Sequence, residues 1–293
     1  MRPVDAPLRA PRPEEVQEFW QRGVVCLRGI LARELVLAMA EPVEETLRDA
    51  RVTVAIAEVA AAAGAEILVD PLASTSPGPR GRFLSGRDHW TVHPAFADFA
   101  CRSPLPAIAA ALLRSQRVWL YEDSVLVKEP GTREATAIHQ DLAYFQVDGE
   151  QICTAWIPLD RVDASSGAVR YVVGSHRSKR SYRPNLFVAG MPVPGSEGED
   201  APQLAELGGA ELAWFESEPG DVVVHHARTL HGAWGNATAD RRRRAISLRY
   251  CGDDVRYKLR PGAARKPHHA RVADGEPLAV DEPGCPVVWP PAP

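Results

Sequence analysis

Residues 118–127, VWLYEDSVLV, begin a series of short runs rich in β-branched and aromatic residues. Four further runs follow, separated by turn-forming residues: ICTAWI at 152–157, AVRYVV at 168–173, DVVVHH at 221–226 and RRAISLRY at 243–250. Because no helical pattern alternates with these runs, they predict antiparallel rather than parallel sheets. We therefore expect a sandwich or barrel from residue 118 onward.

Helical patterns precede this β-rich region. They predict helices over 13–21, 33–51, 52–69 and 104–116, and Gly23 separates the first helix from a buried strand over 24–27. Helices first and strands afterwards indicate a mainly β protein, a two-sheet jelly roll with helices packed on one outer face.

Composition excludes several classes of protein. The chain has 293 residues, 25% of them charged, and a net charge of −4, which does not suit a nucleic-acid binder. The N-terminus lacks the apolar segment of a secretion signal, and no run reads as a membrane span. The five cysteines are scattered and predict free thiols in a reducing, cytoplasmic setting. We expect a cytoplasmic protein that binds neither nucleic acid nor a membrane.

Two segments predict long loops. Residues 70–87 are rich in Pro, Gly and Ser, and residues 182–209 interrupt the series of strands. Long loops within a compact protein are often lids over a binding site.

The pair His139 and Asp141 is the most informative feature for chemistry. In a strand, residues i and i+2 point to the same side, so an imidazole and a carboxylate would be presented together. One more histidine from a neighbouring strand would complete the 2-His-1-carboxylate arrangement, which leaves three positions on a ferrous ion open. A lone His-x-Asp pair is common by chance and is a weak signal alone.

A second segment strengthens this hypothesis. The run at 220–226, GDVVVHH, predicts a strand that feeds a turn, and His231 lies just beyond it. Arg243 then opens the run 243–250, whose alternation places Arg243, Ala245, Ser247 and Arg249 on one face. A guanidinium beside small residues suits an interior that holds a dicarboxylate, since it can donate two parallel hydrogen bonds to one carboxylate.

The chain resembles the phytanoyl-CoA dioxygenase family of Fe(II)/2-oxoglutarate-dependent oxygenases. The matching segments, in order, are EFWQRGVVCLRG at 18–29, KEPG at 128–131, IHQD at 138–141, TAWIPLD at 154–160, GSH at 174–176, GDVVVHH at 220–226, LHG at 230–232 and RRAIS at 243–247. The resemblance covers about 13–255, and we expect a single domain over 1–293 with an irregular tail over 256–293. The order of the segments is specific, although no single segment is.

This resemblance implies a double-stranded β-helix, a cupin-like jelly roll, that uses Fe(II), 2-oxoglutarate and O2. It implies that His139, Asp141 and His231 bind the iron and that Arg243 binds the far carboxylate of 2-oxoglutarate. Trp156 and Lys128 match positions that line the co-substrate pocket in relatives.

Three further positions bear on specificity. Related halogenases have a small residue at the position of Asp141, so the carboxylate here favours hydroxylation. Relatives often carry a serine two residues after the distal histidine, and Ala233 at that position removes one hydrogen bond to the co-substrate. Tyr144 and Phe145, just beyond the His-x-Asp pair, could pack in the core or touch the substrate.

The resemblance implies hydroxylation of an unactivated C–H bond in a small molecule, a natural product or lipid-like metabolite, with release of succinate and CO2. The same site could also catalyse desaturation, epoxidation or ring rearrangement. Alternatives of a different class are a non-catalytic jelly-roll protein that binds a metal or small molecule, and a zinc hydrolase that uses the same three ligands.

The remaining histidines have simpler interpretations. His226 and His176 are predicted to be hydrogen-bonded structural residues. His225 is expected to face solvent or to pack. His268 and His269, in a basic part of the tail, are expected at the surface.

Overall fold

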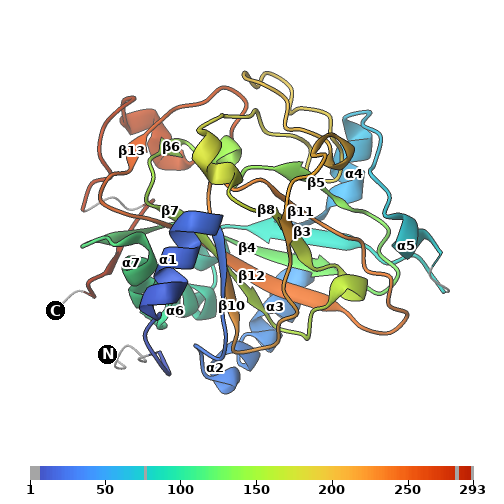
Figure 1. Cartoon of the computed structure of the whole chain (residues 1–293), viewed down its shortest axis with the longest axis horizontal. Helices are drawn as coiled ribbons and strands as arrows, with labels where there is room; N and C mark the ends of the chain where they lie inside the picture. Colours follow the sequence, from blue (N-terminus) through green and yellow to red (C-terminus); the bar gives the residue numbers. More distant parts are fainter. Residues whose placement is uncertain (1–6, 76–77, 281–283, 292–293) are drawn as a thin grey trace.

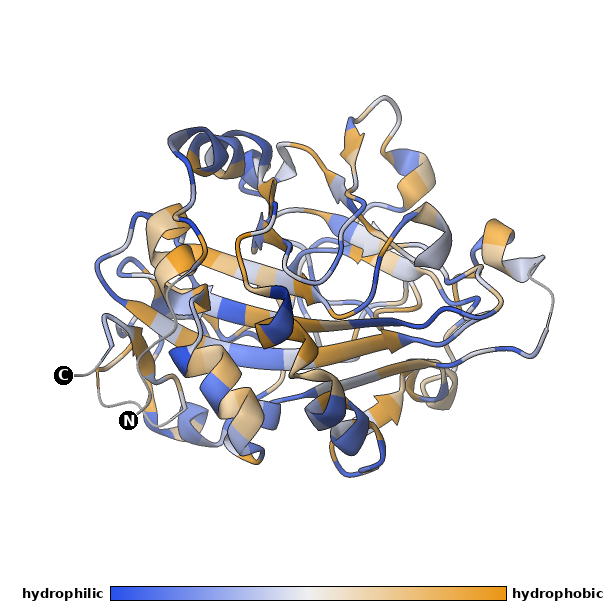
Figure 2. Ribbon diagram, turned by 90° about the horizontal axis from the view of Figure 1, so that it is seen from below, coloured by the Kyte–Doolittle hydropathy of each residue, from blue (hydrophilic) through white to orange (hydrophobic). Residues whose placement is uncertain are grey.

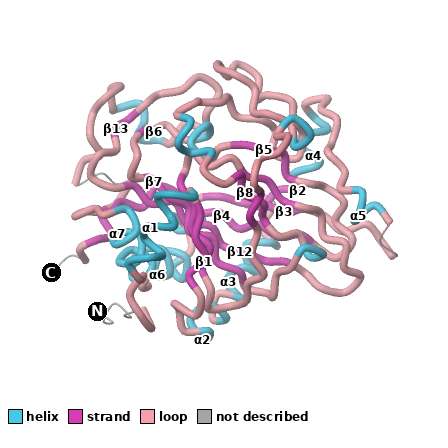
Figure 3. The backbone as a smooth tube through the Cα atoms, viewed as in Figure 1, coloured by secondary structure: helices cyan, strands magenta, loops and turns pink. Residues whose placement is uncertain are grey.

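The strands of the protein form a large and a smaller antiparallel sheet, with helices on the outer side of the large one (Figure 1). The computed structural model describes residues 7–75, 78–280 and 284–291. Strands lie at the centre of the molecule and loops at its periphery (Figure 3). This arrangement confirms the predicted jelly roll with helices on one face.

Within the described residues, the larger sheet has eight strands in the order β1-β10-β7-β12-β4-β3-β2, with β14 paired to β4. Their bounds are β1 (Val24–Leu27), β2 (Thr53–Ala55), β3 (Phe83–Arg87), β4 (Val118–Lys128), β7 (Ile152–Pro158), β10 (Val222–His226), β12 (Arg243–Cys251) and β14 (Val287–Trp289). The predicted strands at 118–127, 152–157, 221–226 and 243–250 all belong to this sheet.

The smaller sheet carries two of the predicted metal-binding histidines. Its strands, in spatial order, are β5 (Thr136–His139), β11 (His231–Ala233), β8 (Val169–Val172) and β9 (Leu212–Ala213). The antiparallel register of β5 and β11 makes His139 and His231 direct cross-strand partners. A separate pair of short strands joins β6 (Val147–Asp148) to β13 (Arg256–Tyr257).

The period-two alternation of the large sheet divides its side chains between two cores. On β10, Val222 and Val224 belong to the core beneath the helices, whereas Val223 packs with Trp156 and Ala245 in the core between the sheets. His225 is two residues after Val223, so it also points between the sheets. The interior of the jelly roll therefore receives alternate residues of β7, β10 and β12.

Most of the helices cover the outer face of the large sheet, whereas α4 (Ile56–Ala62) and α5 (Pro71–Ser74) lie at the edge of the molecule near β2 and β3 (Figure 1). The helices of the outer face are α1 (Pro13–Arg22), α2 (Arg33–Leu37), α3 (Ala40–Leu47), α6 (Pro94–Arg102) and α7 (Leu105–Leu113). Several carry hydrophobic and hydrophilic bands along one helix (Figure 2), as expected where one side packs on a sheet. Trp20 ties α1 to α7 by donating a hydrogen bond to the Leu112 carbonyl at 2.9 Å.

The stretch formed by α6 and α7 is long and apolar enough to cross a membrane by length and composition. However, 67% of its most apolar window is buried within the protein. Phe96, Phe99 and Leu112 of this pair belong to the core beneath the helices. The helix pair is therefore a core element of the fold.

Two helix predictions were wrong in extent. The single helix expected over 33–51 is divided into α2 and α3, and the chain then enters strand β2. The Ala-rich segment after it forms only α4, because β2 pairs with β3 and takes residues 53–55 from the predicted helix. Tertiary strand pairing has overridden local helix propensity at this point.

Two predictions of irregular structure were also wrong in part. The predicted loop over 70–87 contains helix α5 and ends in β3, which pairs with β4 inside the large sheet. A Cβ atom at Gly86 would lie 2.2 Å from the Val52 carbonyl oxygen, so glycine permits the close approach of β2. The expected irregular tail contains β13 and β14 and places Leu278 and Cys285 in the core.

Candidate active site

Three buried side chains from separate elements converge between the two sheets. His139 is the last residue of β5, His231 is the first of β11, and Asp141 begins the 3-10 turn Asp141–Tyr144. One ligand atom from each of the three lies within 4.8 Å of the others. The structure thus brings together all three residues that the sequence predicted as metal ligands.

The local backbone differs from the prediction for this motif. The strand ends at His139 instead of continuing through Asp141. Gln140 nevertheless has extended dihedral angles, with φ −107° and ψ 135°. One extended residue between the two side chains keeps them on the same side, after which the chain turns away.

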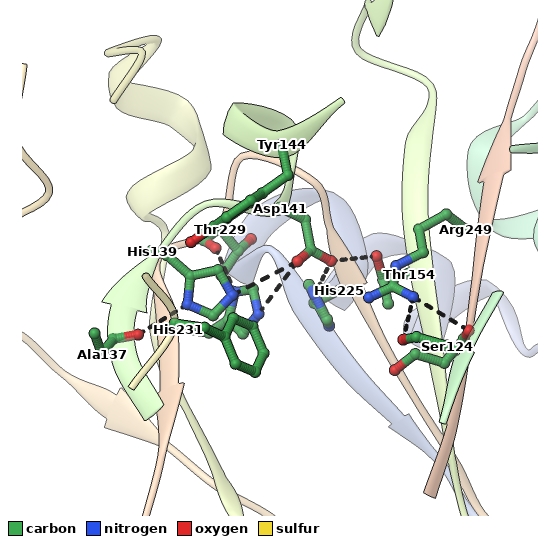
Figure 4. A network of polar contacts seen from close by, with 12 residues as sticks. Ser124, Ala137, His139, Asp141, Tyr144, Thr154, His225, Thr229, His231 and Arg249 are labelled. Atoms are coloured by element: carbon green, nitrogen blue, oxygen red, sulfur yellow. Dashed lines mark hydrogen bonds and ion pairs between the residues drawn. The ribbon is translucent and has the colours of Figure 1, made fainter. Parts of the chain in front are cut away.

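Each histidine of the cluster is fixed by its backbone. Nδ1 of His139 lies 2.8 Å from the Ala137 carbonyl oxygen, and Nδ1 of His231 lies 2.9 Å from that of Thr229 (Figure 4). A carbonyl only accepts, so both Nδ1 atoms carry protons and both Nε2 atoms have free lone pairs. Each Nε2 lies 3.7 Å from the same oxygen of Asp141, Oδ1.

This donor set fits a divalent transition-metal ion. Nε2 of His139 is buried and has no hydrogen-bond partner among the described residues. An unsatisfied buried nitrogen is unfavourable unless something binds it. Two imidazole nitrogens and one carboxylate oxygen on one side of a cavity are the donors that ferrous oxygenase sites use.

The second carboxylate oxygen of Asp141, Oδ2, is fixed by two hydrogen bonds from residues outside the cluster. It accepts hydrogen bonds from Thr154 Oγ1 at 2.5 Å and from His225 Nε2 at 3.1 Å (Figure 4). Burial alone would raise the pKa of Asp141, but the neighbouring imidazoles of His139, His225 and His231 and the charge of Arg249 leave that pKa well below its ordinary value. Asp141 is therefore an anion at neutral pH.

Burial has the opposite effect on His231. Loss of solvent, reinforced by the neighbouring imidazoles of His139 and His225, lowers the pKa of His231 well below its ordinary value. His231 is therefore a neutral imidazole at neutral pH, the form that binds a metal.

A cavity opens in front of the cluster, with about 440 Å³ of empty space when the open solvent at its mouth is included. Beside the cluster itself, its walls are mainly aromatic and aliphatic: Phe83, Leu126, Trp156, Val169, Tyr171 and Phe187. The ring of Phe187 packs 5.1 Å from the ring of His139. Phe187 belongs to the predicted lid segment 182–209, so this loop contributes a wall of the cavity.

Arg243 reaches the same cavity from β12. It is only 2% exposed, its Nε is buried without a partner, and none of its guanidinium nitrogens donates a hydrogen bond to a described residue. The guanidinium lies 5.7 Å from the ring centre of Trp156. Burial lowers the pKa of Arg243 to about 10, so it stays cationic at neutral pH. A buried cation without a protein partner fits an anionic ligand.

Other predicted contacts do not reach the cavity. The Lys128 ammonium is fully buried and donates to the carbonyls of Glu134, at 2.8 Å, and Trp234, at 2.5 Å, behind the cavity wall. The Tyr144 hydroxyl donates to Asn185, and only the ring edge of Tyr144 approaches His139, at 5.6 Å. Phe145 packs against Tyr121 in a separate core cluster. The geometry thus gives these three residues no direct contact with a ligand in the cavity.

Several assignments of the remaining histidines change. His226 and His176 are hydrogen-bonded to backbone carbonyls, as predicted. His225 neither faces solvent nor merely packs, because it is 2% exposed and hydrogen-bonded to Asp141. The strand alternation of β10 could have placed it inside, but not beside Asp141. His268 and His269 were wrongly expected at the surface, since the folded tail buries both.

Known proteins resemble this chain in sequence and in fold. It is 26% identical over 230 residues to the 1-deoxypentalenic acid 11-beta-hydroxylase of Streptomyces arenae, covering 78% of this chain and 76% of that protein. It is 29% identical over 133 residues, 40% of this chain, to a probable phytanoyl-CoA dioxygenase of Caenorhabditis elegans, and spans only 36% of that relative. The structure of the non-haem alpha-ketoglutarate-dependent carbocyclase SnoK superimposes with a TM-score of 0.64 at 23% identity, covering 94% of this chain and 96% of SnoK.

The jelly roll and its buried His-Asp-His cluster thus define a non-haem iron dioxygenase that depends on 2-oxoglutarate. Residues 19–245 match the family model described as phytanoyl-CoA dioxygenase (PhyH), and the chain belongs to that family.

Proposed function

We propose that this enzyme hydroxylates an unactivated C–H bond of a small molecule at an iron centre held by His139, Asp141 and His231. The co-substrate 2-oxoglutarate would yield succinate and CO2. The observation that carries this proposal is the geometry of the cluster. Both Nε2 atoms lie 3.7 Å from Asp141 Oδ1, and each imidazole is locked in the metal-binding tautomer by a backbone carbonyl.

We assign Arg243 to the far carboxylate of 2-oxoglutarate. The cavity offers it no acidic partner within ion-pair distance among the described residues, and its guanidinium nitrogens are free to form a bidentate pair. Ser247, which also lines the cavity, lies on the same face of β12 between Arg243 and the level of the cluster. The co-substrate would lie along this face, with Trp156 beside it.

O2 would supply the oxidising equivalents for attack on a C–H bond, 2-oxoglutarate would supply two electrons as it is oxidised to succinate and CO2, and iron would be the site at which O2 is reduced. The chain itself holds and orients the reactants and excludes water. Thr154 and His225 fix the carboxylate of Asp141, and Arg243 fixes one end of the co-substrate. Phe83 and Phe187 give the cavity an apolar wall beside His139. The substrate would present its C–H bond against this wall.

Hydroxylation is favoured over the other reactions for two reasons. Asp141 fills the position at which a halogenase would need room for a halide. In addition, the relative that aligns over 230 residues is named as a hydroxylase. The small-molecule substrate would enter a mainly apolar cavity, which suits a natural product or lipid-like metabolite.

The test is the visible spectrum of the anaerobic Fe(II) protein with 2-oxoglutarate. Chelation of the co-substrate should give a weak metal-to-ligand charge-transfer band. That band should be lost in His139→Ala and Asp141→Ala, whose folding is checked by thermal melting. Succinate release then provides a screen for substrates.

A wild-type protein that gives no band and retains zinc would contradict the proposal. It would favour a hydrolase or a binding protein on the same scaffold.

A further inference from the structure

The cavity contains a second buried arginine on the same strand as Arg243. Arg249 is 8% exposed and lines the cavity beside the cluster. It is six residues along β12 from Arg243, roughly 20 Å at the rise of a strand. Across the strand pair it faces Thr154, the residue whose hydroxyl holds Asp141. Figure 4 shows its guanidinium beside Thr154.

Only one of the three guanidinium nitrogens of Arg249, Nη1, forms hydrogen bonds with described residues. Nη1 donates to Ser124 Oγ at 2.5 Å and to the Ser247 carbonyl at 3.4 Å. Nε is buried and unpartnered, and Nη2 makes no hydrogen bond with a described residue. The free edge therefore carries the two parallel N–H groups that bind a carboxylate in bidentate fashion.

The nearest acid does not satisfy Arg249. The closest carboxylate oxygen, from Glu122, is 3.9 Å from Nη1, which is beyond hydrogen-bonding distance and on the occupied side. Glu122 is closer to the buried ammonium of Lys266, at 3.5 Å, which also pairs with Asp88 at 2.7 Å. The charge of Glu122 is thus shared with the folded tail. The buried carboxylate of Asp141 is close enough to interact with Arg249 electrostatically, but no carboxylate of a described residue forms a hydrogen bond with its Nε or Nη2.

We propose that Arg249 is the subsite for an anionic group of the substrate, and that the substrates of this enzyme are small carboxylic acids. This inference rests on the proposed function, which assigns 2-oxoglutarate to Arg243. The substrate would pair its carboxylate with the Nε–Nη2 edge of Arg249. Its hydrocarbon part would then lie against the apolar walls, within reach of the iron centre. Ser124 fixes the guanidinium in this orientation.

The test uses acetate, cyclohexanecarboxylate and octanoate as probes, each compared with its uncharged primary amide. The protein is kept anaerobic in low salt with Fe(II) and just enough 2-oxoglutarate to saturate the charge-transfer band. Binding is followed by the shift in melting temperature and by quenching of tryptophan fluorescence. We expect at least one acid to bind about tenfold more tightly than its amide, because charge-assisted bidentate hydrogen bonds are about twice as strong as neutral ones.

Two variants and a control locate the effect. Arg249→Gln should abolish the preference for the acid while leaving the charge-transfer band intact. Arg249→Lys keeps the charge without the planar fork and should retain only part of the preference. Arg228→Gln removes an arginine that is 9% exposed and pairs with Asp148 outside the cavity, and should leave the preference unchanged.

Several outcomes would overturn the proposal. Acids and amides that bind wild-type protein equally throughout the series would do so, as would an unchanged preference in Arg249→Gln. If Arg249→Gln instead weakens 2-oxoglutarate binding as severely as Arg243→Gln, Arg249 belongs to the co-substrate site. A missing charge-transfer band in the wild type would contradict the proposed function, whereas an intact band without acid preference contradicts only this subsite.

Discussion

His225 Nε2 lies 3.1 Å from Oδ2 of Asp141. The other carboxylate oxygen, Oδ1, is the one that lies closer to His139 and His231. Thr154 also donates to Oδ2, at 2.5 Å. These two contacts direct Oδ1 toward the two free Nε2 atoms. His225 is thus a positioning residue, which acts on the predicted metal site through Asp141.

Loss of His225 should weaken metal binding without unfolding the protein. Partners that orient a metal ligand typically contribute 10- to 100-fold in metal affinity. We expect a decrease of that order in His225→Ala, measured by anaerobic titration with Fe(II) or Co(II). His225→Gln, which can still donate to Asp141, should recover part of the loss. An affinity of His225→Ala within twofold of wild type would refute this role.

Among the four consecutive arginines at 241–244, Arg243 is the one assigned to 2-oxoglutarate, and substitution of its neighbour tests this assignment. Arg243→Gln should raise the dissociation constant of 2-oxoglutarate by about 100-fold, since leaving a buried carboxylate without its partner is unfavourable by roughly 2–5 kcal/mol. Arg242→Gln is the matched control, because Arg242 points to the other side and pairs with Glu44 at 2.8 Å. The charge-transfer band measures both. Equal effects of the two substitutions would contradict the assignment of Arg243.

Asn185 fastens the loop that carries Phe187. Its Oδ1 accepts from the Tyr144 hydroxyl at 2.8 Å and from Phe187 N–H at 3.0 Å, and its Nδ2 donates to the Ile138 carbonyl at 2.9 Å. These bonds hold Phe187 at φ +66°, which a bulky residue rarely adopts.

Asn185→Ala should therefore loosen this loop. We expect a loss of about 1–3 kcal/mol in local stability, seen as faster amide hydrogen exchange over 185–190. Tyr144→Phe removes the contacts of the hydroxyl with the side chain and backbone of Asn185 but keeps the bonds from Asn185 to Phe187 and Ile138, and should have a smaller effect. Unchanged exchange in Asn185→Ala would show that other contacts hold the loop.

Asp123 should make stability depend on pH. Burial, together with the carboxylates of Asp88 and Glu122, raises the pKa of Asp123 to about 7 against the hydrogen bonds from His89 N–H and Trp90 N–H. An unfolded aspartate ionises near its ordinary value of about 4. The folded state therefore binds more protons between these values, and the free energy of unfolding should fall as pH rises through this window.

Asp123→Asn should remove this dependence. The difference in pKa corresponds to about 4 kcal/mol between pH 4 and pH 8. Urea unfolding at pH 5 and pH 8 would show a smaller decrease in the variant than in the wild type. The asparagine also leaves one backbone N–H poorly paired, so the comparison is the change with pH, not the absolute stability. Equal changes in both proteins would contradict the raised pKa.

The alternation of residues in strands predicted much of the site. The period of two over 243–250 placed Arg243, Ser247 and Arg249 on one face, and all three line the cavity. The order of short β-rich runs indicated antiparallel sheets, and the resemblance of the motifs indicated the family. Strand alternation, the order of the β-rich runs and the motifs all depend on residues that are close in the sequence, so local patterns are enough to predict them.

Local sequence patterns gave wrong predictions where a segment pairs or packs with a part of the chain that is distant in the sequence. Residues 53–55 lie in an Ala-rich stretch with a helical pattern, yet they form β2 because β3 supplies a hydrogen-bonding partner. His268 and His269 lie in a polar tail, yet both are buried because that tail folds back over the separate core cluster that contains Tyr121 and Phe145. In each case the deciding contact comes from a segment far away in the sequence.

The sequence alone was enough to predict which residues could bind iron and 2-oxoglutarate, from residue type, strand alternation and above all the resemblance of its motifs to those of the family. Only the tertiary structure decided what surrounds them. The pairing of β10 with β7 sets His225 beside Thr154, and together they hold Asp141. The pairing of β12 with β4 and β7 brings Arg249 to the wall of the cavity, and its Nε has no hydrogen-bond partner among the described residues. Hydrogen bonds between strands set these distances, and a linear sequence does not specify which strands become neighbours.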